Sequence, residues 1–488
     1  MKRTGFHALL LFAAALAGGC ATGPGYRRPD VAMPDQWRPG EATTNSLADR
    51  AWTDLYRDPV LNGLVAAALS NNPDVRGAVA RIEEAAAALG IQRAGYWPAL
   101  NGSAAATSAR KGNIPPVRGA EGDQFDVFGA LSYELDVWGR IRRLNEAARA
   151  QVLASEEAKR SVEIGLAAGV ASAYFNLRAL DRQLEIARDT LASREDMLEL
   201  TKVKFADGEG IVSELDVAQA QTQVAAAQSA IANLRRLVAT TENALSVLLG
   251  SCPREIPRGL DLAEQWQPED VPAGLPSDLL LRRPDLRAAE QALVAANANI
   301  GVARAAYFPA ISLTAALGLQ SDELGDLFDT GLSKAWSYSP SLAAPIFNAG
   351  KIRAGVRVAE AQRKGALADY EKAIQNAFRE VDDALAGVRH LREQLAADEE
   401  SVRAEKRRLE LSRLRYEGGV ASYSDVLDAQ RYLFNAELTA VQTRNDLLNA
   451  VVQLYKALGG GWQAAPAAAE TPAPAEQESA KRVPQEVP

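Results

Sequence analysis

The chain has 488 residues, of which 47% are hydrophobic and 24% charged, so most of its length can fold around apolar contacts. Its formal net charge of −8 argues against a nucleic-acid-binding surface. It has two histidines and two cysteines, and none of them shows the spacing of zinc ligands or of a catalytic triad. The composition therefore predicts no metal site, no cofactor, no nucleic-acid partner and no enzyme.

Residues 1–19 have the pattern of an export signal. Lys2 and Arg3 precede an apolar run, and three small residues lie directly before Cys20. This junction resembles the cleavage site of bacterial lipoproteins, in which the cysteine becomes the acylated N-terminus, with palmitate among its acyl chains. We therefore expect Cys20 to be lipidated. The alternative is an ordinary secretory signal followed by a chance cysteine.

The rest of the chain contains two copies of one plan. Tyr96 and Pro98 match Tyr307 and Pro309, and the same offset aligns many further positions. A self-similarity of this kind indicates tandem structural repeats. The resulting expected division is signal peptide 1–19, extended N-terminal segment 20–59, first repeat 60–250, proline-rich linker 251–277, second repeat 278–462 and disordered tail 463–488.

Each repeat is predicted to contain a helix, two strands, a very long helix, a tip and a last helix. In the first repeat the three helices are expected at residues 60–97, 140–204 and 214–249. The long helix carries leucines at a spacing of seven, which is typical of a coiled-coil seam. At 1.5 Å per residue it would be about 100 Å long. The two shorter helices could stack end to end beside it and form a rod of nearly constant thickness.

The segments between the first two helices of each repeat alternate apolar with polar or small residues. They are residues 100–108, where the alternation is weak, 125–136, 311–320 and 336–343. About ten residues of such alternation are typical of transmembrane β-strands. After the signal, no apolar run reaches the roughly 20 residues that a membrane helix needs. The sequence therefore predicts four membrane strands per chain.

Four strands cannot close a barrel, and lipid does not tolerate an open sheet edge. The strands must then be shared between copies of the chain. Two copies would give eight strands, whose interior is filled by side chains, whereas three copies would give twelve strands around a channel. A trimer is therefore favoured over a dimer.

A set of short motifs extends over the mature chain. They are residues 25–29 (GYRRP), 56–61 (YRDPVL), 132–143 (SYELDVWGRIRR), 173–178 (AYFNLR), 213–221 (SELDVAQAQ), 282–287 (RRPDLR) and 426–430 (VLDAQ). Through these motifs the chain resembles the TolC-like outer-membrane factor family, specifically its lipoprotein (NodT/OprM-like) subgroup, which serves multidrug efflux systems.

The resemblance implies a fold class that is mostly α with a transmembrane β segment. Two tandem repeats would give four β-strands and a long α-helical coiled-coil barrel, completed as a homotrimer with a twelve-strand β-barrel and a twelve-helix tunnel. The channel would sit in the lipid of the outer membrane, with its tunnel in the periplasm. It would passively conduct drugs or toxic compounds. Its implied partners are a periplasmic adaptor (membrane fusion protein) and an inner-membrane efflux pump, expected to be of RND type.

Each repeat has a glycine-containing tip between its long helix and its last helix. The tip turns are assigned to Gly208 and Gly210 in the first repeat and to Gly418 and Gly419 in the second. The first tip carries a short insertion and lacks the second of two acidic residues. The second tip is therefore the candidate constriction.

The resemblance places a periplasmic gate at this second tip. The family's ring of aspartates falls on Asp425 and Asp428, and Tyr416 falls on a tyrosine of the closed-state latch of some members. The arginine that follows that tyrosine in those members is Ala421 here, so closure is expected to depend on packing and carboxylates. The structural alternative is that Asp425 is a helix N-cap and Asp428 a first-turn charge, each stabilising by about 0.3–2 kcal/mol.

Other functions remain open at this point. A type I secretion duct with the same fold would export a protein, and a periplasmic coiled-coil scaffold would need no membrane strands. The lipoprotein junction and residues 425–430 (DVLDAQ) favour the efflux branch, and the alternating strands argue against a scaffold. An enzyme is the least expected, because no motif combines a nucleophile, a base or metal ligands.

Overall fold

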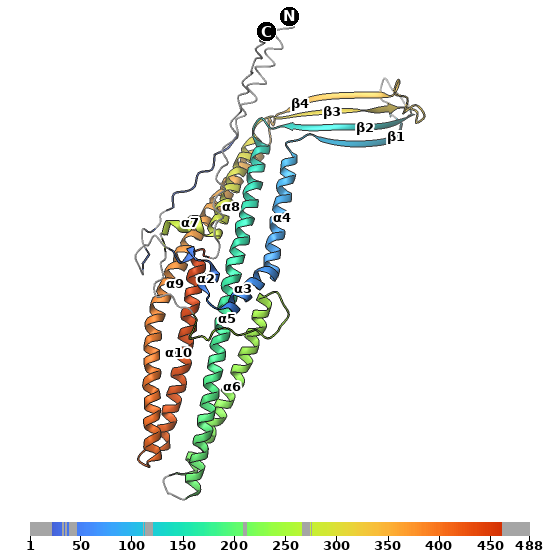
Figure 1. Ribbon diagram of the computed structural model, residues 1–488. Helices are drawn as coiled ribbons and strands as arrows, with labels where there is room; N and C mark the ends of the chain where they lie inside the picture. Colours follow the sequence, from blue (N-terminus) through green and yellow to red (C-terminus); the bar gives the residue numbers. More distant parts are fainter. Residues whose placement is uncertain are drawn as a thin grey trace, which may run out of the picture.

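The computed structural model describes residues 22–31, 34, 37–38, 46–110, 112, 121–207, 212–265, 274 and 276–460. The signal, Cys20, Gly208, Gly210 and the tail from 463 lie outside the described residues. A four-stranded sheet lies at one end of a long rod of helices (Figure 1). None of the helices in the described ranges combines the length and the apolar composition that crossing a membrane requires.

The two repeats have matching elements. The first contains α3 (Pro59–Asn71), α4 (Pro73–Ala94), β1 (Ala99–Arg110), β2 (Glu121–Leu135), α5 (Arg140–Ala206) and α6 (Glu214–Leu248). The second contains α7 (Leu279–Arg282), α8 (Pro284–Ala305), β3 (Ala310–Ser321), β4 (Lys334–Ala343), α9 (Lys351–Glu417) and α10 (Tyr423–Ala457). Both long helices have 67 residues and both last helices have 35. The tandem repeat is thereby confirmed.

Two expectations about local structure were wrong. The single helix expected at residues 60–97 is broken between α3 and α4, because Pro73 has no N–H group and holds Asn72 in an extended conformation. The Asn72 side chain then caps α4 by accepting a hydrogen bond of 2.7 Å from Asp74 N. The segment 20–59 is also not extended throughout, since it contains η1 (Leu47–Asp49) and α2 (Trp52–Leu55).

The sheet joins the two repeats edge to edge. Its strand order is β1-β2-β3-β4 with antiparallel neighbours, and β2 pairs with β3 through pairs such as Ala130 with Ala316. The alternating segments predicted from the sequence therefore all form strands. Among the described residues, β1 and β4 are the two edge strands of the sheet, and each has one side without a partner strand.

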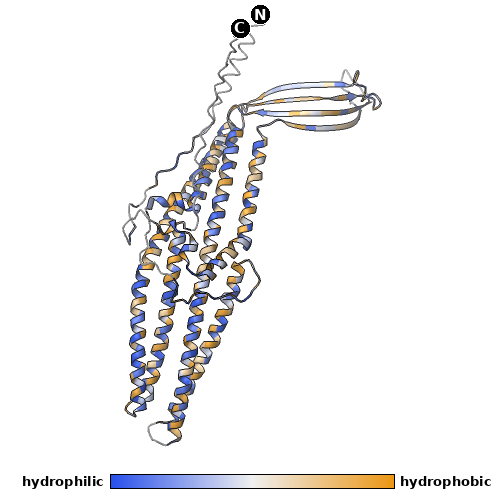
Figure 2. Cartoon of the chain, in the orientation of Figure 1, coloured by the Kyte–Doolittle hydropathy of each residue, from blue (hydrophilic) through white to orange (hydrophobic). Residues whose placement is uncertain are grey.

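The long helix α5 runs along the rod and contacts helices of both repeats. In Figure 1, α4 lies along its sheet-proximal part and α6 along its distal part, as expected from the helix lengths. The largest hydrophobic cluster lies in the middle of the rod and includes the fully buried Tyr174, Leu245, Tyr370 and Leu447. Figure 2 shows hydrophilic and hydrophobic residues mixed along the long helices. This mixture fits helices that pack on one side and meet water on another.

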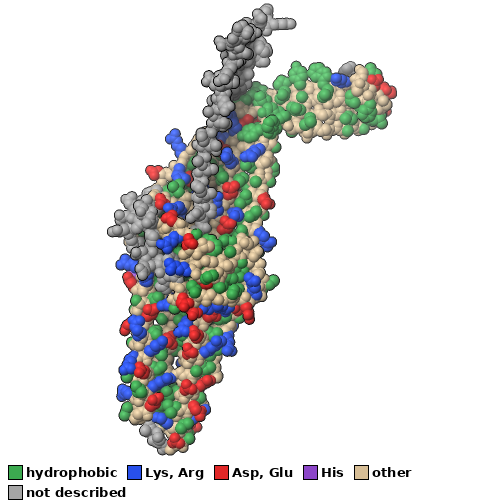
Figure 3. Space-filling view, in the orientation of Figure 1, with side chains coloured by type: hydrophobic (Ala, Val, Ile, Leu, Met, Phe, Trp, Pro, Cys, Tyr) green, Lys and Arg blue, Asp and Glu red, His purple; other side chains and the backbone are tan. Residues whose placement is uncertain are grey.

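The surface divides into two zones. In Figure 3, basic and acidic side chains are scattered over the helical rod, whereas hydrophobic side chains cover much of the sheet. Large apolar residues of the sheet that are exposed in the single chain include Leu100, Leu317, Trp336 and Leu342. Several large apolar side chains exposed together on one sheet indicate a surface that contacts lipid or protein.

Asp58 joins the start of α3 to the linker after α6. Its carboxylate is completely buried and accepts hydrogen bonds from Val60 N at 2.9 Å, Tyr174 Oη at 2.9 Å and Gln265 Nε2 at 2.9 Å. Burial alone would raise the pKa of Asp58, but the hydrogen bonds from Gln265, Tyr174 and backbone N–H groups outweigh it and lower the pKa. This single carboxylate thus connects three segments in the middle of the rod.

Replacing Asp58 by asparagine is expected to lower the stability of the helical rod by about 2–3 kcal/mol, because buried donors lose a charged acceptor. Since the pKa of Asp58 is lowered in the folded state, its ionised carboxylate stabilises the fold fully above the ordinary aspartate pKa of about 3.9. This stabilisation is lost as the pH falls below that value. Thermal melting followed by circular dichroism from pH 7 to pH 3 measures both effects. The exposed Asp54 provides the control. Equal melting temperatures for the Asp58→Asn and Asp54→Asn variants would contradict the assignment.

Candidate gate at the second helical tip

The second tip lies at the end of the rod opposite the sheet (Figure 1). Helix α9 ends at Glu417, and Gly419 has a left-handed backbone with φ +72°. Val420 N then donates to Arg415 O at 2.9 Å and closes the turn. A left-handed residue after a helix favours glycine, because a side chain there is strained. The structure therefore has the turn at Gly418 and Gly419, where the sequence predicts it.

The acidic pair lies on the first turns of α10. Ser422 occupies the N-cap position, so Asp425 is not the cap and the structural alternative was wrong for this residue. Asp425 accepts a hydrogen bond from Ser422 Oγ at 3.2 Å, and Asp428 pairs with Arg431 at 3.1 Å. Both carboxylates are exposed in the single chain.

Tyr416 also belongs to the second tip, but unlike the two aspartates it is buried. Its side chain is 2% exposed and packs with Tyr423 and Val426 of α10 and with Met197 of α5 and Ala220 of α6. The rings of Tyr416 and Tyr423 are 5.6 Å apart. Burial raises the pKa of Tyr416 and raises that of Tyr423 to about 12, so both phenols stay neutral at physiological pH. We call these five residues the tip cluster; it joins the two hairpins of one chain.

Lys204, near the end of α5, crosses to the second hairpin. Its Nζ lies 4.7 Å from the centre of the Tyr416 ring and donates a hydrogen bond of 3.3 Å to Tyr416 O. A cation over an aromatic ring contributes about 0.5–2 kcal/mol. The residue pattern of the sequence does not predict this contact. The repeat does contain a signal for it. Lys204 directly precedes Phe205, the repeat counterpart of Tyr416, so Lys204 and Tyr416 occupy nearly equivalent positions at the ends of the two long helices.

A second polar contact joins the hairpins about three turns of α5 further from the tip. Ser193 of α5 receives hydrogen bonds from Gln430 Nε2 at 3.3 Å and from an Arg413 guanidinium nitrogen. The neighbouring Arg194 donates to Gln223 O at 2.9 Å and lies over the Phe434 ring at 5.6 Å. The sequence does not predict these contacts either, because no sequence pattern specifies how α5 lies against α9 and α10.

The first tip is built differently. Asp216 forms a capping box with Ser213, whose N–H donates to the Asp216 carboxylate at 2.8 Å. Its carboxylate is therefore used by its own helix. Gly208 and Gly210, assigned to this turn, lie outside the described residues.

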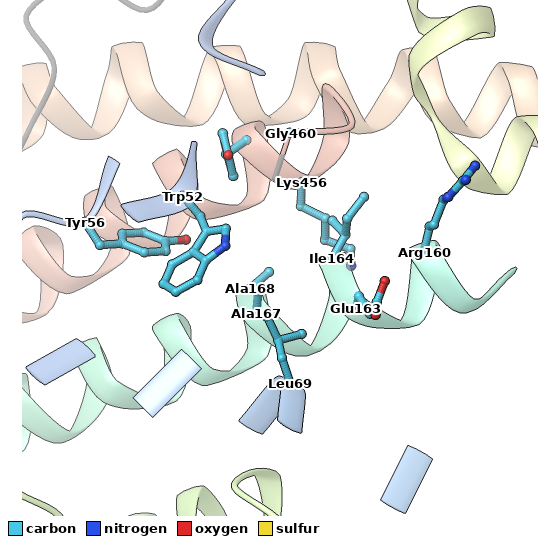
Figure 4. Close-up of a pocket in the computed structure, with 11 residues that line it drawn as sticks. Trp52, Tyr56, Leu69, Arg160, Glu163, Ile164, Ala167, Ala168, Lys456 and Gly460 are labelled. Carbon is cyan, nitrogen blue, oxygen red and sulfur yellow. The ribbon is translucent and has the colours of Figure 1, made fainter. Parts of the chain in front are cut away.

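A separate pocket of about 220 Å³ lies in the middle of the rod (Figure 4). Trp52, Tyr56 and Leu69 line it from the N-terminal segment and α3, and Ile164 lines it from α5. Arg160, Glu163 and Lys456 add the charged part of the lining. No cluster of three or more metal-binding side chains occurs in the described ranges. The tip, where two hairpins meet and two carboxylates are exposed, remains the candidate functional site.

Comparison with known proteins decides what kind of molecule carries this tip. Residues 64–251 and 275–460, one segment for each repeat, match the outer membrane efflux protein family. The chain belongs to this family. The resemblance drawn from the motifs is thereby confirmed, as is the fold class of one chain, mostly α with four strands in two repeats.

Relatives match along nearly the whole chain. The solvent efflux pump outer membrane protein SrpC of Pseudomonas putida is 44% identical over 470 residues, covering 94% of this chain and 98% of SrpC. The cation efflux system protein CusC of Escherichia coli is 37% identical over 463 residues, covering 93% of this chain and 99% of CusC. The structure of the open MtrE outer membrane channel of Neisseria gonorrhoeae has a TM-score of 0.82 and 35% identity, covering 91% and 98%.

These matches establish the function in outline. The chain is an outer-membrane efflux channel and not an enzyme. The outer membrane as its location and efflux as its role, both expected from the sequence, are confirmed. The scaffold alternative is excluded, because the family members are channels.

Proposed function

We propose that three copies of this chain close their sheets into one twelve-strand barrel and their helices into one twelve-helix tunnel across the periplasm. The observation that carries this proposal is the pair of unpaired edges at β1 and β4 on an otherwise complete, apolar sheet. Lipid does not tolerate such edges, so β4 of one copy pairs with β1 of the next. Three copies give a barrel wide enough for a channel, whereas two would give a filled one.

Lipidation of Cys20 would anchor the assembly beside its barrel. The described chain begins near this residue: Thr22 N donates to Trp138 O at 3.1 Å, at the turn between β2 and α5. Thr22 is thus held at the end of the rod that carries the sheet, where a lipid would reach the membrane. The mass of the intact mature protein tests the proposal. An unmodified Cys20, or a cleavage at another residue, contradicts it.

The duct would receive its cargo from partners. We propose a periplasmic adaptor and an inner-membrane pump of RND type, with the energy supplied by the pump. Relatives are named for the efflux of solvents, toluene, antibiotics and cations. By analogy with these names, the cargo would be small toxic compounds or drugs, and not a folded protein.

In the closed state, Asp425 and Asp428 of each copy would surround a narrow neck at the tips. Their carboxylates would attract cations and hinder anions. The tip cluster and Lys204 would hold each second hairpin against the first, and opening would move the hairpins apart. The exposure of both carboxylates in the single chain supports this role.

Deletion of the chain from its host tests the function. We expect the host to become more sensitive to antibiotics and organic solvents, with its secreted proteins unchanged, and a plasmid copy to restore resistance. Loss of a secreted protein with unchanged resistance would instead support a type I secretion duct. Native mass spectrometry of the purified protein in detergent tests the trimer independently.

A further inference from the structure

The two repeats pack unequally within one chain. Helix α5 of the first repeat lies along α8 of the second repeat. The equivalent pair would be α9 and α4, and in the described structure these two helices do not pack along one another. Both keep apolar side chains exposed, with Ile91 of α4 72% exposed and Val358 of α9 56% exposed. Each helix therefore lacks a neighbour that its repeat counterpart has.

The junction between β2 and α5 shows how such neighbours meet. Gly139, with φ +78°, turns the chain into α5. The preceding Trp138 stacks on Phe308, at the junction of α8 and β3, with ring centres 4.7 Å apart. Its indole Nε1 also donates to Pro309 O at 2.7 Å. An aromatic contact thus fixes the first repeat to the second at the base of the sheet.

The junction between β4 and α9 has the same backbone but different side chains. Gly350, with φ +83°, turns the chain into α9 just as Gly139 does for α5. Ala349 stands where the first repeat has Trp138, and Phe347, 88% exposed, stands where it has Asp136. This junction therefore offers a small residue and an exposed aromatic ring, with no partner in the described part of the chain.

A matching group exists at the other edge of the chain. Trp97, the repeat counterpart of Phe308, lies between α4 and β1 and is 76% exposed. Within the chain, Phe308 stacks on Trp138. At the second junction the residue equivalent to Trp138 is Ala349. The Trp97 and Phe308 position is thus aromatic in both repeats, whereas the opposite position changes from Trp138 to Ala349, so at the second junction a large exposed side chain would meet a small one.

We propose that Trp97 of one copy packs against Ala349 and Phe347 of the next copy, and that this junction contact fixes the register between copies. The proposal rests on the trimer of the proposed function. Pairing of β4 with β1 of the next copy brings the two positions to the same level, because Trp97 lies two residues before β1 and Phe347 follows the end of β4. The intrachain contact of α5 with α8 is then repeated between copies by α9 with α4.

Cysteine crosslinking tests the contact directly. In a Cys252→Ser background, which removes the exposed native thiol, Trp97→Cys and Ala349→Cys are combined and treated in membranes with a short bismaleimide. Ala349 has φ +48° and already carries a Cβ, so a cysteine adds only one sulfur atom there. We expect covalent dimers and trimers on a denaturing gel. Each single variant, and the pair of Trp97→Cys with Leu411→Cys near the far end of α9, should give none.

Two further measurements separate the outcomes. Native mass spectrometry of the double-cysteine variant without crosslinker, and of the unsubstituted protein, shows whether each forms trimers. If the unsubstituted protein forms no trimers, the proposed assembly itself is overturned. Intact trimers without crosslinks would overturn the junction contact alone and would leave Trp97 facing lipid. If the cysteine pair assembles poorly, Trp97→Ala in the unsubstituted chain should lower the temperature at which trimers dissociate, and Trp97→Phe should largely restore it. Equal dissociation temperatures for the three proteins contradict the proposal.

Discussion

Replacing Asp425 and Asp428 together by alanine is expected to give a channel that leaks. The carboxylates of the neighbouring copies would no longer narrow and charge the neck, so small solutes and ions would pass without the pump. We expect a several-fold higher single-channel conductance in planar bilayers and a weaker preference for cations. In cells, the variant should increase sensitivity to large antibiotics that the outer membrane normally excludes.

The first tip supplies the matched control for this pair. Gln219 occupies the position on α6 that Asp428 occupies on α10, and it carries no charge. Gln219→Ala should therefore leave conductance and ion preference unchanged. Asp216 is unsuitable as a control, because it belongs to the capping box of its helix. If the double aspartate variant forms normal trimers with the conductance and selectivity of the unsubstituted channel, the gate is not at these residues.

Replacing Tyr416 by alanine is expected to release the second hairpin at its tip. The ring fills the centre of the tip cluster, and removal of a buried aromatic side chain costs about 3–5 kcal/mol when the site cannot collapse. The contact with Lys204 would be lost as well. Hydrogen exchange of residues 405–430 should become faster, with little change near the sheet, and the closed channel should open more often in bilayers.

Two conservative variants separate the parts of this effect. The ring of Tyr416, and not its hydroxyl, fills the tip cluster, so Tyr416→Phe should be close to neutral. Lys204→Met keeps the aliphatic stem but removes the charge over the ring, and should give a smaller increase in opening, in line with a contribution of about 0.5–1 kcal/mol. A Tyr416→Phe channel as open as Tyr416→Ala would mean that the packing of the ring is not what holds the tip.

The sequence was most informative where one residue pattern has one structural solution. Alternation over about ten residues predicted three of the strands clearly and the strand at residues 100–108 only weakly, because side chains of a strand point to opposite faces in turn. The match of Tyr96 with Tyr307 predicted two copies of one plan. The spacing of leucines along residues 140–204 predicted a single long helix, and α5 has this form.

Local chemistry was predicted less well where a single residue overrides a pattern. The apolar periodicity of residues 60–97 continues through Pro73, but the missing N–H group of that proline breaks the helix. At the second tip, Ser422 takes the N-cap position that the sequence reasoning considered for Asp425. Both oxygen-bearing side chains can cap a helix, so the sequence alone did not distinguish them.

By itself, then, the sequence determined the repeat, the strands, the long helices and the acidic second tip, because each depends on residues that are neighbours along the chain. Only the tertiary structure decided that Tyr416 is buried between two hairpins, that Lys204 crosses to it, and that Trp138 stacks on Phe308 while Trp97 is left exposed. These contacts join segments that are far apart in sequence. Their geometry depends on how α5 lies against α8 and α10, which no local pattern specifies.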